Sequence, residues 1–108
     1  MNKFKVDFDL FEKLFDKISG EPEITIYFND NENQYMIIKY DDYVTFQKCG
    51  IVDGSSEIKY NNLRELFETK TIDDICLKDK WNEINDIIID ESLSLKDDLD
   101  YIKQVYKL

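Results

Sequence analysis

The spacing of apolar side chains changes from helical to alternating near Pro22, and this change limits the possible folds most strongly. Over 7–19 apolar residues recur every three or four positions, which predicts an amphipathic helix capped by Asp7. Beyond Pro22 apolar and polar residues alternate, which predicts strands. The four predicted strands cover 23–28, 34–40, 43–48 and 57–60. Clusters of turn-forming residues separate them at 29–33, 41–42 and 53–56. We therefore expect an antiparallel meander over 23–60.

The alternation also assigns side chains to two faces of the sheet. If Tyr40 pairs with Tyr43 across the turn, one face is apolar enough to form the core. That face carries Tyr35, Ile37, Val44 and Phe46. The opposite face carries Met36, Ile38, Tyr40, Tyr43 and Thr45. Because this second face is also rich in tyrosine, it is either covered by a second layer or exposed as a binding surface.

Helical spacing returns after the meander. A short helix is predicted over 61–69, where Asn62 and Glu65 have the spacing of a capping box. Arg64 lies one turn before Glu68, so these two side chains can form an ion pair along the helix. A helix over 78–85 and a fifth strand over 86–90 are expected next.

The last predicted helix covers 95–107. Ser94 is its expected cap, and Asp97 completes the capping box. Its apolar stripe consists of Leu95, Leu99, Ile102, Val105 and Tyr106. The whole pattern predicts one α+β domain over 1–108, in which the N-terminal and C-terminal helices pack on one face of an antiparallel sheet of four to five strands.

The charge of the chain excludes several functions. It has 24 Asp and Glu, 14 Lys and Arg and no His, which gives a formal net charge of −10. Such a surface does not attract nucleic acid or anionic lipid, so we expect neither a direct nucleic-acid partner nor a membrane partner. The acidity either serves solubility alone or attracts a basic protein.

The composition also indicates an origin and a compartment. The absence of alanine and the single arginine are typical of a genome poor in G and C, as in a low-GC bacterium or its phage. Cys49 and Cys76 lie far apart with no His nearby, so a zinc site is not expected and both thiols should be free. The N-terminal residues lack the pattern of a signal peptide, and no apolar run exceeds four residues. A cytoplasmic protein is expected.

Two sets of residues are candidates for binding a partner. The first is the acidic segment 83–100, in which Lys96 is the single base. Its acids are Glu83, Asp86, Asp90, Glu91, Asp97, Asp98 and Asp100. The second set is the tyrosine pair Tyr40 and Tyr43, which offers large contact area at low cost in side-chain entropy. Each set also has a plainer interpretation, as a solvated helix face and as part of a packed layer.

Catalysis finds little support in the sequence. The acid pairs lie at 41–42, 73–74, 90–91 and 97–98. Adjacent side chains diverge in strands and in helices, so none of these pairs converges on one substrate atom. Phosphate-binding loops, nucleophile elbows and zinc-protease motifs are missing. We expect no catalytic residue, no cofactor and no metal.

In size, acidity and lack of catalytic motifs, the chain is similar to small immunity and inhibitor proteins of low-GC bacteria and their phages. The leading hypothesis is therefore an immunity protein that covers the basic active site of a toxin such as a nuclease. A phage-encoded anti-defence inhibitor that mimics nucleic acid is a close alternative. A small-ligand protein or enzyme that uses carboxylates and tyrosines, and a structural or regulatory subunit, are the others.

Overall fold

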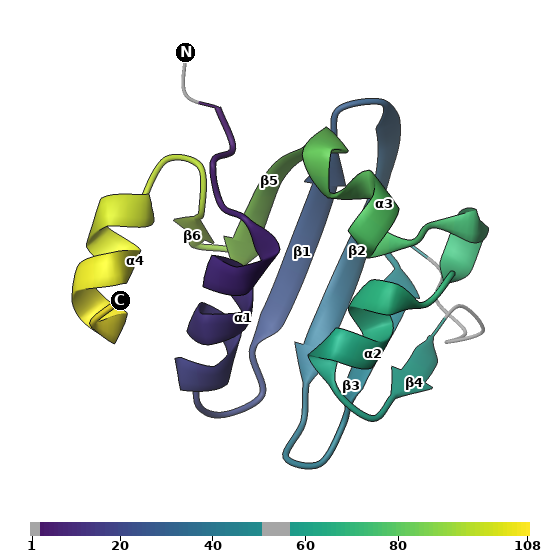
Figure 1. Ribbon diagram of the computed structural model, residues 1–108, viewed down its shortest axis with the longest axis horizontal. Helices are drawn as coiled ribbons and strands as arrows, with labels where there is room; N and C mark the ends of the chain where they lie inside the picture. Colours follow the sequence, from purple (N-terminus) through teal and green to yellow (C-terminus); the bar gives the residue numbers. More distant parts are fainter. Residues whose placement is uncertain (1–2, 51–56) are drawn as a thin grey trace.

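The computed structural model describes residues 3–50 and 57–108, and its centre is a single antiparallel sheet. The strands follow the order β4-β3-β2-β1-β5-β6 (Figure 1). Their bounds are Glu23–Phe28 (β1), Asn31–Lys39 (β2), Val44–Lys48 (β3), Ile58–Tyr60 (β4), Ile84–Ile89 (β5) and Leu93–Ser94 (β6). The α+β class and the meander are confirmed, and the two-residue strand β6 raises the number of strands to six. The turn predicted at 53–56 lies outside the described residues.

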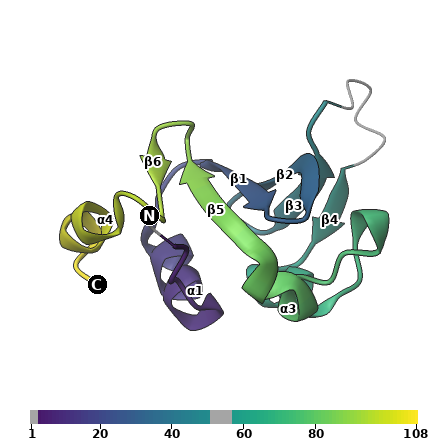
Figure 2. The ribbon, with the colours of Figure 1, turned by 90° about the horizontal axis from the view of Figure 1, so that it is seen from above.

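The helices lie on one face of this sheet, as Figures 1 and 2 show. The α-helices are Phe8–Lys17 (α1), Leu63–Glu68 (α2), Leu77–Lys80 (α3) and Leu99–Tyr106 (α4). Short 3-10 turns cover Ile72–Asp74 (η1) and Trp81–Glu83 (η2). α4 lies beyond β6 and next to α1 in both views.

The core fills the space between the helices and the sheet. The four side chains predicted for the inner face of β2 and β3 are all buried: Tyr35, Ile37, Val44 and Phe46. Trp81 is packed between aromatic rings of the N-terminal segment, α1 and α2, including Phe8, Phe11 and Phe67. Phe8 and Phe67 stack with ring centroids 3.6 Å apart, so these rings join α1 to α2.

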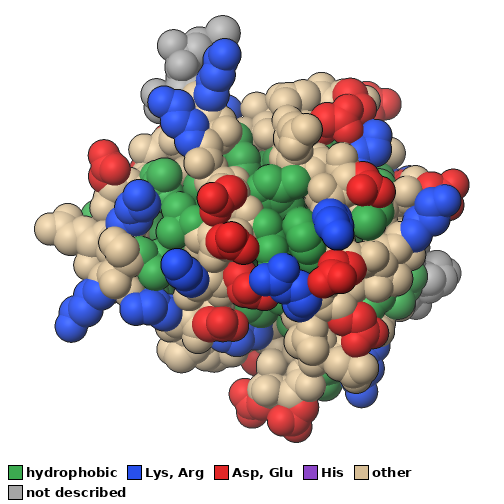
Figure 3. All heavy atoms as spheres, in the orientation of Figure 1, with side chains coloured by type: hydrophobic (Ala, Val, Ile, Leu, Met, Phe, Trp, Pro, Cys, Tyr) green, Lys and Arg blue, Asp and Glu red, His purple; other side chains and the backbone are tan. Residues whose placement is uncertain are grey.

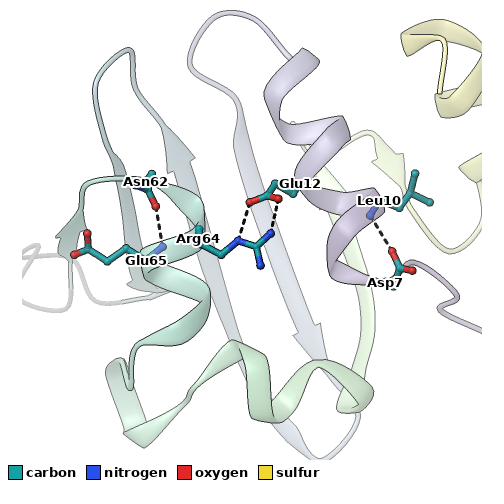
Figure 4. Close-up of polar contacts among 6 residues, drawn as sticks. All are labelled: Asp7, Leu10, Glu12, Asn62, Arg64 and Glu65. Carbon is teal, nitrogen blue, oxygen red and sulfur yellow. Dashed lines mark hydrogen bonds and ion pairs between the residues drawn. The ribbon is translucent and has the colours of Figure 1, made fainter.

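The predicted N-caps of the first two helices are confirmed. Asp7 accepts a hydrogen bond of 2.8 Å from the Leu10 backbone N–H at the start of α1. Asn62 accepts one of 2.8 Å from the Glu65 backbone N–H at the start of α2 (Figure 4). These bonds satisfy backbone donors that a helix leaves free at its N-terminus.

Arg64 does not form the predicted pair with Glu68. Its guanidinium donates two hydrogen bonds to Glu12 on α1, of 2.7 and 3.2 Å, and lies 4.9 Å from the centre of the Phe8 ring (Figure 4). A bidentate carboxylate on a neighbouring helix offers better geometry than a single contact along α2. Arg64 therefore connects two helices instead of stabilising one.

Several bounds differ from the prediction, and for three of them the structure gives the reason. β2 begins at Asn31, because the turn before it needs only Asn29 and Asp30. β5 begins at Ile84, two residues before the predicted start, because the helical segment formed by α3 and then η2 ends at Glu83. α4 begins at Leu99 instead of residue 95, because 95–98 form a turn joined to β5.

The predicted apolar stripe of α4 is only partly buried. Leu95 and Ile102 are fully buried, and Leu99 and Tyr106 are half-buried against the core. Val105 is 50% exposed, and its neighbour on the helix surface, Tyr101, is 59% exposed. α4 therefore docks by a narrow strip, because it lies at the edge of the sheet.

Candidate protein interface on the open face of the sheet

No described helix covers the second face of the sheet (Figure 2). The strand register identifies its side chains, because residues opposite each other across antiparallel strands point to the same face. Its apolar members are Tyr27, Met36, Ile38, Tyr40, Tyr43 and Ile88, all half-buried. The sequence left open whether this face is covered or exposed, and the structure has helices on the other face alone. We call this surface the open face.

Tyr40 and Tyr43 form one corner of the open face. The Tyr40 backbone N–H donates a 2.9 Å hydrogen bond to the Tyr43 carbonyl, which confirms the predicted pairing across the turn. The two rings are stacked, with centroids 4.7 Å apart. The ammonium of Lys59 on β4 lies 4.3 Å from the centre of the Tyr43 ring. The corner is thus an aromatic platform that already holds one cation.

Carboxylates surround this corner. Burial raises the pKa of Tyr40, and the negative charges of Glu57, Glu21 and Glu23 raise it further. Glu23 lies directly across from Ile38 in the pairing of β1 with β2. The open face therefore has an apolar centre and an acidic rim, which is the usual arrangement of a protein interface for a basic partner.

A shallow hollow of about 370 Å³ lies at the β1–β2–β5 end of the same face. Its lining includes Tyr27, Met36, Ile88 and Glu91. Glu91 and Asp90 form the turn between β5 and β6, where both have positive φ angles of 61° and 50°. The Asp90 carboxylate accepts a 2.9 Å hydrogen bond from the Glu23 backbone N–H, which fixes this acidic turn to β1. Both acids of the turn are exposed.

Thr45 is the polar side chain at the centre of the β3 part of the open face. It lies between Ile38 of β2 and Lys59 of β4 in the register and is only 3% exposed. Within residues 3–50 and 57–108, its hydroxyl is the one buried side-chain polar atom without a hydrogen-bond partner. A buried hydroxyl that lacks a partner costs about 1–3 kcal/mol.

The structure separates the acids of 83–100 into several groups. Asp90 and Glu91 border the open face, as described above. Glu83 forms an ion pair of 3.1 Å with Lys80 at the end of η2. Asp97, Asp98 and Asp100 lie at the start of α4, beyond β6. The seven acids are therefore distributed over η2, β5, the two turns that flank β6 and the start of α4.

Asp86 has an internal role. It is 7% exposed, and its carboxylate accepts hydrogen bonds from the backbone N–H groups of Ile87 and Lys96 and from the hydroxyl of Ser94. These bonds hold the turn before α4 against β5. Because both of its carboxylate oxygens already accept hydrogen bonds and little of the side chain is exposed, we do not propose Asp86 as a partner contact.

The predicted capping box closes the turn 95–98 before α4 and not the helix itself, and it uses a different acid from the one expected. Asp97 donates its backbone N–H to the Ser94 hydroxyl at 3.0 Å, as predicted. The carboxylate that returns to the Ser94 backbone N–H is that of Asp98, at 2.9 Å. Asp98 is thereby tied to the fold, whereas Asp97 and Asp100 are exposed.

The best location for a small-ligand site is at the opposite end of the core. The Tyr35 hydroxyl donates a 2.6 Å hydrogen bond to Asp73, which also pairs with Lys48 at 3.0 Å, beside a hollow of about 160 Å³. The Tyr35 bond is the main cause that lowers the pKa of Asp73, while burial and then the bond to Asp73 raise the pKa of Tyr35. Both shifts take the pKa values of these groups further from neutral pH, which makes each a poorer general acid or base there. The arrangement suits an anchor for η1 better than an acid–base pair.

The helix-bearing face offers no region of a single charge sign. Figure 3 shows acidic and basic side chains mixed across it, with hydrophobic groups between them. Mixed charges of this kind suit a solvated surface, since neighbouring ions of opposite sign cancel at a distance.

Sequence reasoning identified Tyr40 and Tyr43 but missed other members of the open face. Glu23 and Lys59 were missed because the pairing of their strands, and not the alternation alone, places them beside Ile38 and Thr45. Glu57 was missed because it precedes β4, and its position near Tyr40 does not follow from the alternation. A signal was present: Lys59 lies between Ile58 and Tyr60, so its face was implied once β4 was assigned.

Comparisons with known proteins add no identity. No family model, curated protein or solved structure matches the chain. In the described part of the chain no group of three or more His, Cys, Asp or Glu residues could hold a metal ion. None of the helices described is long and apolar enough to cross a membrane. Function must therefore be argued from the surface itself.

Proposed function

We propose that this protein is a non-catalytic binding module that inhibits a basic protein, such as a toxin nuclease, by covering its active site with the open face. One observation carries the proposal: a sheet face with no described helix over it combines half-buried aromatic side chains with an acidic rim. Sites for nucleic acid are lined with Lys and Arg, so such a rim complements them.

Tyr40 and Tyr43 are the proposed central anchors, and Asp90 and Glu91 are proposed rim contacts. Tyrosines at the centre of an interface commonly dominate binding energy, while charged groups at the rim set the association rate. Asp97 and Asp100, which are exposed at the start of α4, would act at longer range by steering the partner. We propose that the protein acts in the cytoplasm, where its free cysteines stay reduced.

A capture experiment with matched variants tests the proposal. The tagged wild type, a Tyr40→Ser/Tyr43→Ser variant and a Tyr101→Ser/Val105→Ser variant are each used to isolate partners from the native cell, with quantitative mass spectrometry. The second variant removes two apolar groups of α4 that are more exposed than Tyr40 and Tyr43, and it serves as the control. We expect a basic protein that the wild type and the control capture and the tyrosine variant does not.

The captured protein is then purified and assayed with the wild type added. We expect its activity on nucleic acid to be inhibited in proportion to occupancy. Capture that is unaffected by the tyrosine substitutions, or full activity in the saturated complex, would contradict the proposal.

A further inference from the structure

The corner formed by Tyr40, Tyr43 and Thr45 has the features of a site for one cationic side chain. We infer that it receives a guanidinium group of the partner, an arginine, and that Lys59 occupies this place in the free protein. The inference rests on the proposed function, since it names the chemistry that the open face recognises.

The first observation is the position of Lys59. Its ammonium lies 4.3 Å from the centre of the Tyr43 ring, and its strand position is directly across from Thr45. A cation over a tyrosine ring is stabilised only weakly at an exposed site, so this contact is easily exchanged for a better one. Lys59 itself is exposed and free to move into solvent.

The second observation is the unsatisfied hydroxyl of Thr45, which points to a missing hydrogen-bond donor or acceptor. An arginine meets both requirements at once, because its planar group stacks on a ring by its face and donates N–H bonds from its edge. An ammonium cannot do both equally well, since it has no planar face.

The third observation is charge. Glu57, Glu21 and Glu23 lie near enough to Tyr40 to raise its pKa, while Lys59 is the one base among the open-face residues that the register identifies. A second cation that displaces Lys59 therefore enters an environment of net negative charge. The site accommodates one group, because the stacked ring of Tyr40 already covers one side of Tyr43.

The test uses single amino-acid probes and no partner. Nα-acetyl-arginine methylamide is titrated into the protein, and the ring resonances of Tyr43 and the side-chain resonances of Lys59 are followed by NMR. The lysine and citrulline analogues are the comparison probes. We expect saturable binding in the order arginine, lysine, citrulline, with the Lys59 resonances moving toward those of a solvated lysine. Equal binding of arginine and lysine, or binding of citrulline as strong as that of arginine, would overturn the inference.

Two substitutions separate the site from general electrostatics. Lys59→Met should tighten arginine binding several-fold, whereas Lys13→Met, which makes the same charge change on α1, should have a much smaller effect. Thr45→Val should weaken arginine binding several-fold without lowering the free energy of unfolding, because the hydroxyl has no partner to lose. Equal effects of the two lysine substitutions, or loss of stability in Thr45→Val, would contradict the inference.

Failure of this inference and failure of the proposed function give different results. If the captured partner depends on the two tyrosines but no arginine probe binds the isolated protein, the arginine assignment is wrong and the inhibitor proposal stands. If the probe binds as predicted but no captured protein depends on the tyrosines, the arginine assignment stands and the inhibitor proposal is wrong.

Discussion

Two buried polar side chains of the sheet, Asp86 and Thr45, differ in whether their hydrogen bonds are satisfied. Asp86 accepts three hydrogen bonds and joins β5 to the segment before α4. Thr45 has none within the described part of the chain. A buried polar group whose hydrogen bonds are satisfied, such as Asp86, stabilises the fold. A buried polar group without a partner, such as Thr45, indicates a hydrogen-bond partner that binds from outside the free protein.

Asp86→Ala should therefore lower the free energy of unfolding by about 3 kcal/mol, because it leaves the Lys96 backbone N–H and the Ser94 hydroxyl without their acceptor. Denaturant unfolding measures the change. Asp100→Ala, at an exposed acid of α4, is the control and should change stability by less than about 0.5 kcal/mol. Equal effects of the two would mean that the carboxylate of Asp86 does not organise this region.

Asp73 makes acid stability a second test at this scale. The Tyr35 hydroxyl and Lys48 hold the pKa of Asp73 below its ordinary value of 3.8. The stabilising effect is therefore complete above this ordinary value and is lost as the pH falls through the lowered one. Asp73→Asn should be less stable than the wild type near pH 7, and the difference should shrink at the acid end of that window. A difference that stays constant from pH 7 to strong acid would contradict this role.

Individual helices and strands were predictable where local chemistry decides them. The starts of α1 and α2 follow from Asp7 and Asn62, since each cap bonds to a backbone N–H three residues away. The start of α4 was not predictable, because Asp98 and Asp86, one of them on a strand, jointly bind the turn that precedes it. The same distinction holds for Arg64, whose partner Glu12 lies 52 positions away and not on its own helix.

Arg64→Met tests the connection between α1 and α2. It removes the bidentate contact with Glu12 and the cation over Phe8 but keeps a long apolar side chain. Because the pair is exposed, we expect only a small loss in the free energy of unfolding, and a smaller one at high salt. Thermal unfolding at low and high ionic strength measures it. A loss independent of salt would assign the effect to packing.

At the scale of the molecule, the sequence predicted two faces for the sheet but not which of them stays uncovered. Both faces of β2 and β3 are apolar in sequence, and the positions of the helices depend on contacts across the whole core. For the same reason the seven acids of 83–100 looked like one patch, although the fold buries Asp86 and ties Asp98 to the Ser94 backbone N–H. Tyr40 and Tyr43 were identified because strand alternation alone places them together.

Long-range attraction by the whole molecule can be separated from contact energy. Replacing Asp97, Asp98 and Asp100 with Lys changes the net charge of the chain from −10 to −4. We expect slower association with a basic partner at low salt, a little-changed dissociation rate, and convergence with the wild type at high salt. Surface plasmon resonance at several salt concentrations measures both rates. A large increase in the dissociation rate would place these acids within the contact.

The most direct test of the account is the affinity of the captured partner for two variants, measured by calorimetry at physiological salt. The account predicts that Tyr40→Ser/Tyr43→Ser weakens binding by about 30-fold or more, as expected for central anchors worth at least 2 kcal/mol. It predicts that the triple lysine variant of α4 weakens binding much less. The opposite order, with the tyrosines dispensable and the α4 acids essential, would contradict the claim that the open face binds the partner.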